Sequence, residues 1–133
     1  MILSRCRVEL RSYCNFMNKR KFSSSFIGQK QFLLLATDYT DAEAYSRRLS
    51  ARNDHLARAK LAKEQGSVVL GGAILANVEN SNTEGKMVGS LIIFEAENEE
   101  QIRKEIEKDP YVINKVWEKY EIWPFKMAKL IKE

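Results

Sequence analysis

Cysteine is almost absent from this chain of 133 residues, and its two copies, Cys6 and Cys14, both lie near the start. The rest of the chain therefore contains no disulfide, no thiolate nucleophile and no cysteine-ligated metal. Histidine occurs once, as His55, so a metal site built from several histidines is also excluded. From these absences we expect neither a metal nor a cofactor.

Long hydrophobic runs are also lacking. A membrane-spanning helix needs about 18–20 consecutive apolar residues, and no stretch of this sequence approaches that length. We therefore expect no membrane span. The chain has room for one domain and an extension, because two domains within this length would each lack a sufficient core.

Acidic residues are scarce only at the beginning of the chain. Residues 1–31 hold seven basic groups and one acid, Glu9, whereas residues 32–133 hold 15 basic and 17 acidic groups. The formal net charge of +4 thus comes from the leader. Nucleic-acid binding by the body is not expected, because the body has no excess positive charge and residues 89–94 lack the basic–aromatic ribonucleoprotein motif.

The leader has the composition of a mitochondrial presequence, with arginine, serine and scattered apolar residues and almost no acid. The run Arg20-Lys21-Phe22-Ser23 resembles a matrix-peptidase site that would make Ser23 the first mature residue. We expect a cleaved presequence at residues 1–22, a linker at 23–30, a folded domain at 31–133 and a location in the mitochondrial matrix. The alternative is a disordered basic tail or a nucleic-acid arm.

The first half of the body predicts a strand followed by a long helix. A short apolar run at residues 31–37 predicts a buried strand. Thr40 has capping-box spacing to Glu43, good helix formers continue to Gln65, and Gly66 is a natural end for the helix.

This long helix has one narrow apolar stripe. At 100° per residue the stripe contains Tyr45, Leu49, Leu56 and Ala59. Arg52 falls within it and His55 at its border. We therefore expect this face of the helix to meet the core.

The second half predicts two strands, a helix and a last strand. The strands at residues 68–76 and 87–96 are joined by a polar loop. Asn98 caps the second helix together with Gln101, and Asp109-Pro110 stops it. A short helical stretch then leads to a strand at residues 120–127.

The order strand–helix–strand–strand–helix–strand indicates an α+β fold, the ferredoxin-like split βαββαβ sandwich with an antiparallel sheet. In the last strand, Tyr120 and Ile122 point to one face while Trp123, Phe125 and Met127 point to the other. Both faces are apolar, although the helices of one domain cover only one face. The pattern therefore predicts a homodimer that packs sheet against sheet.

Several short motifs resemble the YCII-related domain family. In chain order they are Arg52-Asn53-Asp54-His55-Leu56, Leu70-Gly71-Gly72, Gly89-Ser90-Leu91, Asp109-Pro110-Tyr111-Val112 and Glu121-Ile122-Trp123-Pro124-Phe125. The resemblance covers residues 31–127 and implies a dimeric ferredoxin-like α/β barrel, similar to the muconolactone isomerase group. It also implies an acid–base couple at His55 and Asp109, and it includes Arg52. Ala73 departs from the proline of many relatives, which would alter the rim of the pocket.

The couple at His55 and Asp109 has a plausible mechanism. A carboxylate fixes the tautomer of a histidine and stabilises its imidazolium, which leaves the other ring nitrogen free to carry a proton. The alternative is that His55 is a hydrogen-bonded residue at the border of the core and that Asp109 is a helix cap before proline. The same aspartate can serve as both cap and partner.

Three further positions are candidates for substrate binding. Arg52 is costly to bury unpaired, so it either extends outward along its methylene stem or reaches a carboxylate, from Asp109 or from a bound acid. Ser90 lies where a strand side chain can face the pocket, as a contact rather than a nucleophile. Gly71-Gly72 predicts a bulge or a close backbone approach, because no helix follows it to form a phosphate cradle.

The resulting hypothesis is a dimeric mitochondrial enzyme that transfers protons on a small, acidic organic molecule. His55 would act as general acid or base, Asp109 would orient it, and Arg52 and Ser90 would bind the substrate. The lactone- or enol-type chemistry is implied by the resemblance alone. The alternative is a non-catalytic ligand-binding or structural homodimer that retains the pocket.

Overall fold

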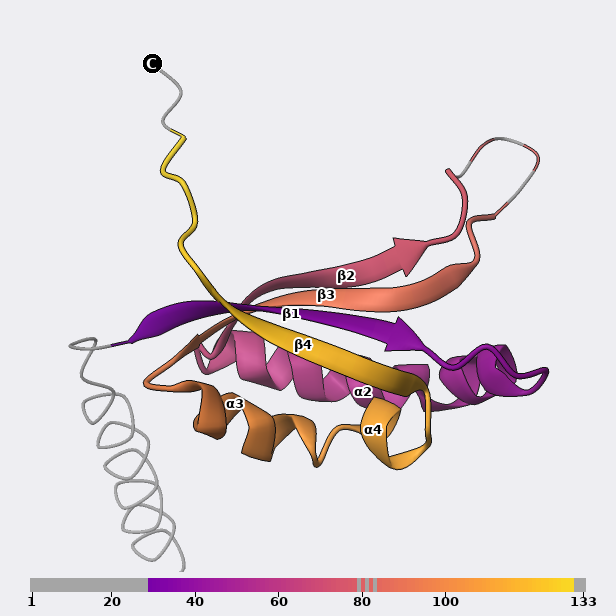
Figure 1. Ribbon diagram of the computed structural model, residues 1–133, viewed down its shortest axis with the longest axis horizontal. Coiled ribbons are helices and arrows are strands. Elements are labelled where there is room, and N and C mark those ends of the chain that lie inside the picture. The colour runs from indigo at the N-terminus through magenta and orange to yellow at the C-terminus, as the bar shows by residue number, and fades with distance from the viewer. Residues whose placement is uncertain (1–28, 79, 81, 83, 131–133) are drawn as a thin grey trace, which may run out of the picture.

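The computed structural model describes residues 29–78, 80, 82 and 84–130. Within them the chain forms β1 (Lys30–Asp38), α2 (Ala44–Glu64), β2 (Val68–Leu75), β3 (Met87–Ala96), α3 (Glu99–Ile106), α4 (Pro110–Ile113) and β4 (Trp117–Phe125) (Figure 1). The expected presequence at residues 1–22, and the linker up to residue 28, lie outside the described residues. No helix in the described part has the length and apolar character needed to cross a membrane.

The strands form one antiparallel sheet in the order β2-β3-β1-β4. The helices α2, α3 and α4 all lie on the same side of this sheet (Figure 1). The element order and the single antiparallel sheet confirm the predicted α+β, ferredoxin-like sandwich. Among the described residues, no helix lies on the opposite side of the sheet.

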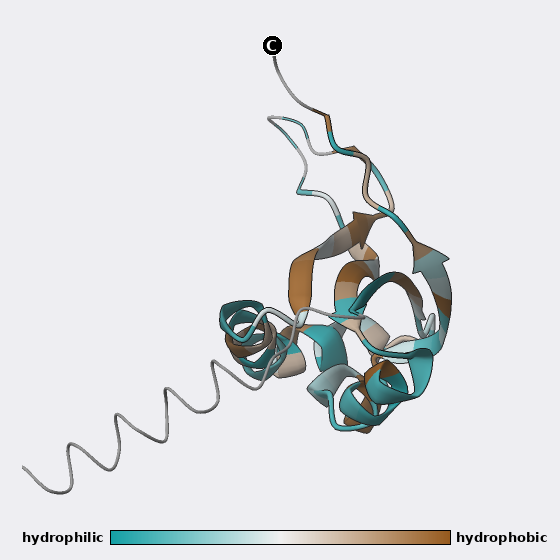
Figure 2. Cartoon of the chain, turned by 90° about the vertical axis from the view of Figure 1, so that its left-hand side faces the viewer, coloured by the Kyte–Doolittle hydropathy of each residue, from teal (hydrophilic) through white to brown (hydrophobic). Residues whose placement is uncertain are grey.

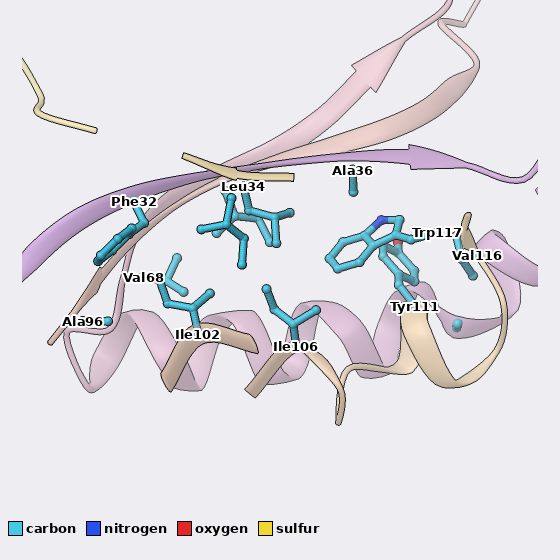
Figure 3. Close-up of a cluster of buried hydrophobic side chains, with 13 residues drawn as sticks. Phe32, Leu34, Ala36, Val68, Ala96, Ile102, Ile106, Tyr111, Val116 and Trp117 are labelled. Atoms are coloured by element: carbon cyan, nitrogen blue, oxygen red, sulfur yellow. The ribbon is translucent and has the colours of Figure 1, made fainter. Parts of the chain in front are cut away.

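The core lies between the sheet and the helices (Figure 3). Phe32, Leu34 and Ala36 alternate along β1 and point toward the helices, as the two-residue period of a strand requires. Ile102 and Ile106 of α3 meet them from below and are 2% and 3% exposed. The two isoleucines are one helical turn apart, which places both on the buried face of α3.

The face that α2 turns to the core differs from the predicted apolar stripe. The buried residues of α2 are Ala44, Arg48, Ala51 and His55. Leu49 and Leu56 of the predicted stripe are 50% and 44% exposed, and Arg52 is exposed. The prediction was wrong because Arg48 and His55 find polar partners in the interior, so that burying them is less costly than their hydropathy suggests.

The first turn of α2 also corrects a prediction. The N-cap is Glu43, which makes no side-chain capping bond, so the capping box from Thr40 does not form. Instead, Asp41 Oδ1 accepts from the backbone N–H of Glu43 at 3.2 Å, and its carboxylate accepts from Arg47 at 2.7 Å. The hydrogen bonds from Arg47 lower the pKa of Asp41 to about 2. The predicted end of the helix is confirmed by Gly66, which has a φ of +82°.

The cap of α3 forms as predicted. Asn98 Oδ1 accepts from the backbone N–H of Gln101 at 2.9 Å, and Gln101 Oε1 accepts from the N–H of Glu97 at 3.0 Å. Because both ends of this reciprocal pair are satisfied, the helix begins at a defined residue.

The last strand begins at Trp117 rather than at residue 120, and it ends at Phe125 rather than at residue 127. Lys115 has a positive φ of 54° and completes the turn after α4. Val116 and Trp117 follow it directly into the core and are 0% and 5% exposed. The chain is therefore extended and buried earlier than the apolar pattern of the strand indicates.

The glycines of the sheet also differ from expectation. The pairing of β2 with β3 shifts register between Val68 and Leu70 and between Ile74 and Leu75, whereas Gly71-Gly72 pairs regularly with β3. A Cβ on Gly72 would meet no atom within 4 Å, so neither the predicted bulge nor a close approach occurs there. The close approach belongs to Gly89, where a Cβ would clash with the carbonyl oxygen of Ala36.

The side of the sheet that faces away from the helices carries an apolar row. Cross-strand pairing aligns four side chains across the sheet, namely Leu70, Ile93, Leu33 and Trp123. At the two ends of this row, Leu70 and Trp123 are 43% and 57% exposed. In Figure 2 much of the hydrophobic colour lies on the strands, while the helices show mostly hydrophilic colour. In the part of the chain that the structure describes, the sheet thus has one face covered by helices and one apolar face without cover.

Candidate active site

A pocket of about 830 Å³ opens between α2 and the sheet. Its polar end is formed by Arg48, His55, Ser90, Asp109, Tyr111 and Trp117. Its apolar end is formed by Val68, Ile92, Phe94, Ile102 and Ile106. In Figure 3, Val68 and Ile102 lie toward one end of the core and Tyr111 and Trp117 toward the other, with Ile106 between them. An apolar cavity with a few converging polar groups is typical of small-molecule sites.

His55 and Asp109 lie in contact at the polar end. His55 Nδ1 is 2.8 Å from Asp109 Oδ1 and 3.0 Å from Oδ2. Because a carboxylate only accepts, Nδ1 carries the proton and donates it. Nε2 then has no hydrogen-bond partner in the described part of the chain. The sequence pattern alone did not require this contact, which was implied by the resemblance.

Asp109 is itself held in place by α4. Its Oδ1 accepts from the backbone N–H of Tyr111 at 2.8 Å, so the same carboxylate caps this helix and binds His55. Pro110 occupies the first turn of α4, where its missing N–H costs nothing. The two roles considered for Asp109 are therefore combined.

Aromatic rings clamp the imidazole. The ring of Tyr111 stacks on His55 with centroids 3.8 Å apart and an interplanar angle of 12°. The ring of Trp117 meets it edge-on at 5.7 Å and 78°. The imidazole therefore has little freedom to turn, and Nε2 keeps its place in the wall of the pocket.

Arg48 and Asp38 form a second buried pair. Arg48 Nη1 donates to both oxygens of Asp38 at 2.8 and 2.9 Å, and the two side chains are 2% and 9% exposed. Burial raises the pKa of Asp38, while the charge and hydrogen bonds of Arg48 act against this rise. Arg48 Nε is buried and has no hydrogen-bond partner in the described residues.

Ser90 lies between the second pair and the aromatic clamp. Its Oγ accepts from Arg48 Nη2 at 3.1 Å and from Trp117 Nε1 at 3.2 Å. The guanidinium carbon of Arg48 lies 4.7 Å from the centre of the Tyr111 ring, and burial raises the pKa of that tyrosine. The contacts close into a ring that runs from His55 through Tyr111, Arg48, Ser90 and Trp117 back to His55.

Arg52 lines the pocket and is exposed to solvent, which places it at the rim. It makes no hydrogen bond or ion pair with any described residue, and the carboxylate of Asp109 faces His55 instead. Of the alternatives considered, the contact with Asp109 is not formed. The guanidinium of Arg52 is thus free to bind a ligand.

Three residues of the site were not identified from the sequence, namely Arg48, Tyr111 and Trp117. A signal for Arg48 does exist, because it shares one helical face with Ala44, Ala51 and His55. Small residues at helical spacing around a charged one permit close packing against the sheet. Trp117 was missed because it was placed before the last strand instead of within it.

Metal-ligating side chains do not gather in the described residues, where no group of three or more His, Cys, Asp or Glu could hold an ion. The polar end of the pocket instead contains one imidazole, one carboxylate that caps a helix, a serine and two aromatic rings. This set suits the binding and protonation of an organic molecule.

Comparisons with known proteins agree with this architecture. A family model described as the YCII-related domain matches residues 31–126. The chain is 36% identical over 106 residues to an aspartate kinase of Fusarium oxysporum f. sp. lycopersici, covering 76% of this chain but only 19% of the kinase. It is 35% identical over 102 residues to fusaric acid biosynthesis protein 2 of Gibberella fujikuroi, covering 73% of this chain and 93% of that protein.

A solved structure with the same fold is the 5-chloro-2-hydroxyhydroquinone dehydrochlorinase of Burkholderia phenoliruptrix, in complex with 2,5-dihydroxybenzoquinone. The TM-score is 0.62 at 23% sequence identity, and the match covers 74% of this chain and 95% of that one. At this identity the likeness establishes the fold.

Proposed function

The chain belongs to the YCII-related domain family, and we propose that it is an enzyme that transfers protons on a small, acidic organic molecule. His55 acts as general acid or base, Asp109 orients it, and Arg52 and Ser90 bind the substrate. The observation that carries this proposal is the bond from His55 Nδ1 to Asp109 at 2.8 Å, which leaves Nε2 without a partner among the described residues that line the pocket.

The proton transfer uses the two ring nitrogens of His55 differently. Neutral His55 accepts a proton from the bound molecule at Nε2, and the carboxylate of Asp109 stabilises the imidazolium through Nδ1–H. The proton then returns to another atom of the molecule, which leaves the enzyme unchanged. A positioned base of this kind typically contributes about 10²–10⁴-fold to the rate.

Arg52 is the guanidinium that remains available for an anionic group. Arg48 is already engaged with Asp38 and Ser90, whereas Arg52 has no partner among the described residues and lies on the rim. A guanidinium presents a fork of N–H donors that matches a carboxylate. An acidic substrate therefore places its charged group at the entrance and its reacting atoms near His55.

The relatives support small-molecule chemistry for this pocket. The solved neighbour is a dehydrochlorinase with a bound dihydroxybenzoquinone, so this fold can hold an acidic organic ring. Fusaric acid biosynthesis protein 2 is named for the production of a small acid. Similarity of fold does not specify function, and the assignment of roles rests on the geometry of His55.

The proposal is tested by incubating mitochondrial metabolite extract with the protein and following the loss of each compound by mass spectrometry. Wild type should deplete at least one small acid, and His55→Gln should slow that depletion about 100-fold or more. The matched control is Asp54→Asn, because Asp54 is exposed on α2 next to His55 and does not line the pocket. A compound that binds without being consumed would favour the non-catalytic alternative.

We also propose that the chain forms a homodimer through the open face of the sheet. The apolar row from Leu70 to Trp123 supports this, because a bare apolar face is costly in water. Light scattering should give about twice the mass of the chain, and Trp123→Glu should give a monomer. Ile113→Glu is the control, since Ile113 is 64% exposed on α4, away from this face.

Mitochondrial delivery remains a proposal that rests on the composition of residues 1–22. Protein recovered from mitochondria should begin at Ser23, as determined by mass spectrometry of its terminal peptide. An intact Met1 on most molecules, or a purely cytosolic pool, would contradict it.

A further inference from the structure

We propose that Ser90 is a catalytic hydrogen-bond donor to a single negatively charged oxygen, and that the substrate is therefore an enolisable carbonyl compound or a phenol with an apolar body. Arg48 and Trp117 act as positioning residues that direct the serine hydroxyl. This inference deepens the proposed function and rests on it for the role of His55 as the proton acceptor.

The hydrogen bonds of Ser90 determine where its proton points. A serine hydroxyl has two acceptor lone pairs and one O–H donor. Arg48 Nη2 and Trp117 Nε1 are groups that only donate, and they occupy the lone pairs at 3.1 and 3.2 Å. The O–H has no acceptor among the described residues, and Ser90 forms part of the pocket wall. The proton that remains is therefore available only to a molecule in the pocket.

The same contacts exclude Ser90 as a nucleophile. A nucleophilic serine needs a free lone pair and a base that takes its proton. Both lone pairs of Ser90 are engaged by Arg48 and Trp117. No hydrogen bond joins Ser90 to His55 in the described residues, so no base is in place to take its proton. We therefore assign the Ser90 O–H as a hydrogen-bond donor to the substrate oxygen on which negative charge develops.

The surroundings of Ser90 favour negative charge at that position. Ser90 is 3% exposed, and hydrogen bonds to an ionised partner are strong where water is excluded. The N–H groups of Arg48 and Trp117 polarise the hydroxyl by donating to its oxygen. Two further donors at this end lack a partner in the described chain, namely buried Arg48 Nε and the phenol of Tyr111, whose pKa is raised by burial.

The ring of contacts places this donor beside His55. Trp117 bonds to Ser90 through Nε1 and meets His55 edge-on, so only one side chain separates the two groups. In enolisation, Nε2 takes a proton from the carbon next to a carbonyl. The C–H electron pair forms the C=C bond, and the carbonyl π pair moves to the oxygen, where Ser90 donates. The electron pair of the enolate then takes the proton back from Nε2, either at the same carbon or, where a further C=C bond is conjugated with the enolate, at the far end of that system. The carbonyl group re-forms in either case.

A single donor suits one oxygen rather than a carboxylate, which is better matched by the fork of Arg52. The rest of the pocket then selects the body of the molecule. Its volume of about 830 Å³ lies in the upper part of the range for drug-sized ligands. Ile92 and Phe94 line the far end, so a molecule that consisted only of a small polar ring would leave apolar surface unfilled.

The test uses 4-nitrophenol, whose ionised and neutral forms absorb at different wavelengths, and 4-nitroanisole, which has the same ring but cannot ionise. Binding is measured over a range of pH that spans the ionisation of the probe. Wild type should bind the phenolate at least about tenfold more tightly than the anisole, because hydrogen bonds to charged groups are stronger than neutral ones. The anisole reports any effect of pH on the protein itself.

The variants distinguish the effect of losing the Ser90 hydroxyl from the effect of disturbing the fold. Ser90→Ala should weaken phenolate binding about tenfold or more, Ser90→Thr should restore much of it, and Trp117→Phe should cause a smaller loss by freeing the hydroxyl to turn. The control is Ser67→Ala, because the Ser67 hydroxyl donates to the Ala62 carbonyl at 3.1 Å and is already satisfied. The Thr and Phe variants keep the test valid if Ser90→Ala does not fold.

The outcomes distinguish this inference from the proposed function. His55→Gln should still bind the phenolate, since binding requires no proton transfer. Equal affinity for phenolate and anisole in wild type, no binding at millimolar probe, or unchanged binding in Ser90→Ala would overturn the role of Ser90. Those results would leave the His55-dependent depletion of a metabolite standing, and failure of the depletion alone would leave the oxyanion site standing.

Discussion

Arg48 and His55 of α2 each form a buried pair with an aspartate, Asp38 and Asp109 respectively. The two pairs differ in which polar atoms remain without a hydrogen-bond partner. Arg48 Nη1 donates to both carboxylate oxygens of Asp38, and Arg48 Nη2 donates to Ser90. Of the guanidinium nitrogens, only Nε lacks a partner in the described residues. His55 and Asp109 also meet closely, but Nε2 lies at the pocket wall with no partner in the described residues. The first pair stabilises the polar end of the pocket, and we propose that the second carries out the proton transfer.

Tyr111 connects the two pairs. Its ring stacks on His55 on one side and lies 4.7 Å from the guanidinium carbon of Arg48. Its backbone N–H also donates to Asp109. A buried charge therefore does not identify a reactive group by itself. The informative feature is unused hydrogen-bonding capacity directed at a cavity.

The largest effect is expected from Arg48→Met. Removing the arginine leaves the carboxylate of Asp38 buried without a partner, which costs about 3–5 kcal/mol in the free energy of unfolding at neutral pH. Urea denaturation measures this loss. The control is Arg47→Met, which breaks the exposed pair with Asp41 and should cost far less because solvent screens that pair.

The sign of the pH dependence follows from Asp38. In Arg48→Met nothing opposes burial, so the folded-state pKa of Asp38 rises further above its unfolded value. The contribution of this group to stability is then fully present below the unfolded pKa and is lost as the pH rises through the folded one. The variant should recover stability at acidic pH, and a loss that does not depend on pH would contradict the architectural role of the pair.

A smaller effect is expected from changes to Asp109. Asp109→Ala removes the cap of α4 and the bond to His55, which should cost about 1–2 kcal/mol in the free energy of unfolding. Asp109→Asn keeps a good capping residue and should cost about half as much, but it should reduce proton transfer as strongly as alanine does. Thermal unfolding and turnover measured side by side check this, and equal destabilisation by Asn and Ala would show that capping is not the structural role.

The smallest effect is expected from Tyr111→Phe. The hydroxyl has no hydrogen-bond partner among the described residues, so its removal should change stability by less than about 0.5 kcal/mol. The stack on His55 and the contact with Arg48 depend on the ring and remain. A loss above about 1.5 kcal/mol would mean that the hydroxyl forms a hydrogen bond within the protein. The assignment of polar groups with and without a partner at this end of the pocket would then be wrong.

Local patterns predicted most of the fold. The bounds of β3 were predicted as residues 87–96 and are confirmed, because its apolar run is bordered by a polar loop and by the Asn98 cap. Gly66 and Asn98 act through neighbours a few residues away, which a sequence displays directly. These features do not depend on the rest of the chain.

The face of α2 could not be predicted in the same way. Hydropathy assigns Leu49 to the core and Arg48 to solvent, yet Arg48 is buried because Asp38 and Ser90 bond to it. Those partners are 10 and 42 residues away in the chain, so only the folded sheet brings them together. The contact between His55 and Asp109 was likewise implied by the resemblance, not by helical spacing, since 54 residues separate them.

The most direct test of the central claim measures proton transfer itself. Wild type and His55→Gln are incubated with mitochondrial metabolite extract in D₂O, and mass spectrometry follows deuterium that becomes bound to carbon. The account predicts that at least one acidic compound gains deuterium with wild type, and about 100-fold more slowly with His55→Gln. If no compound gains deuterium, or if the two proteins label it at the same rate, His55 is not the base and the pair of His55 and Asp109 has no catalytic role.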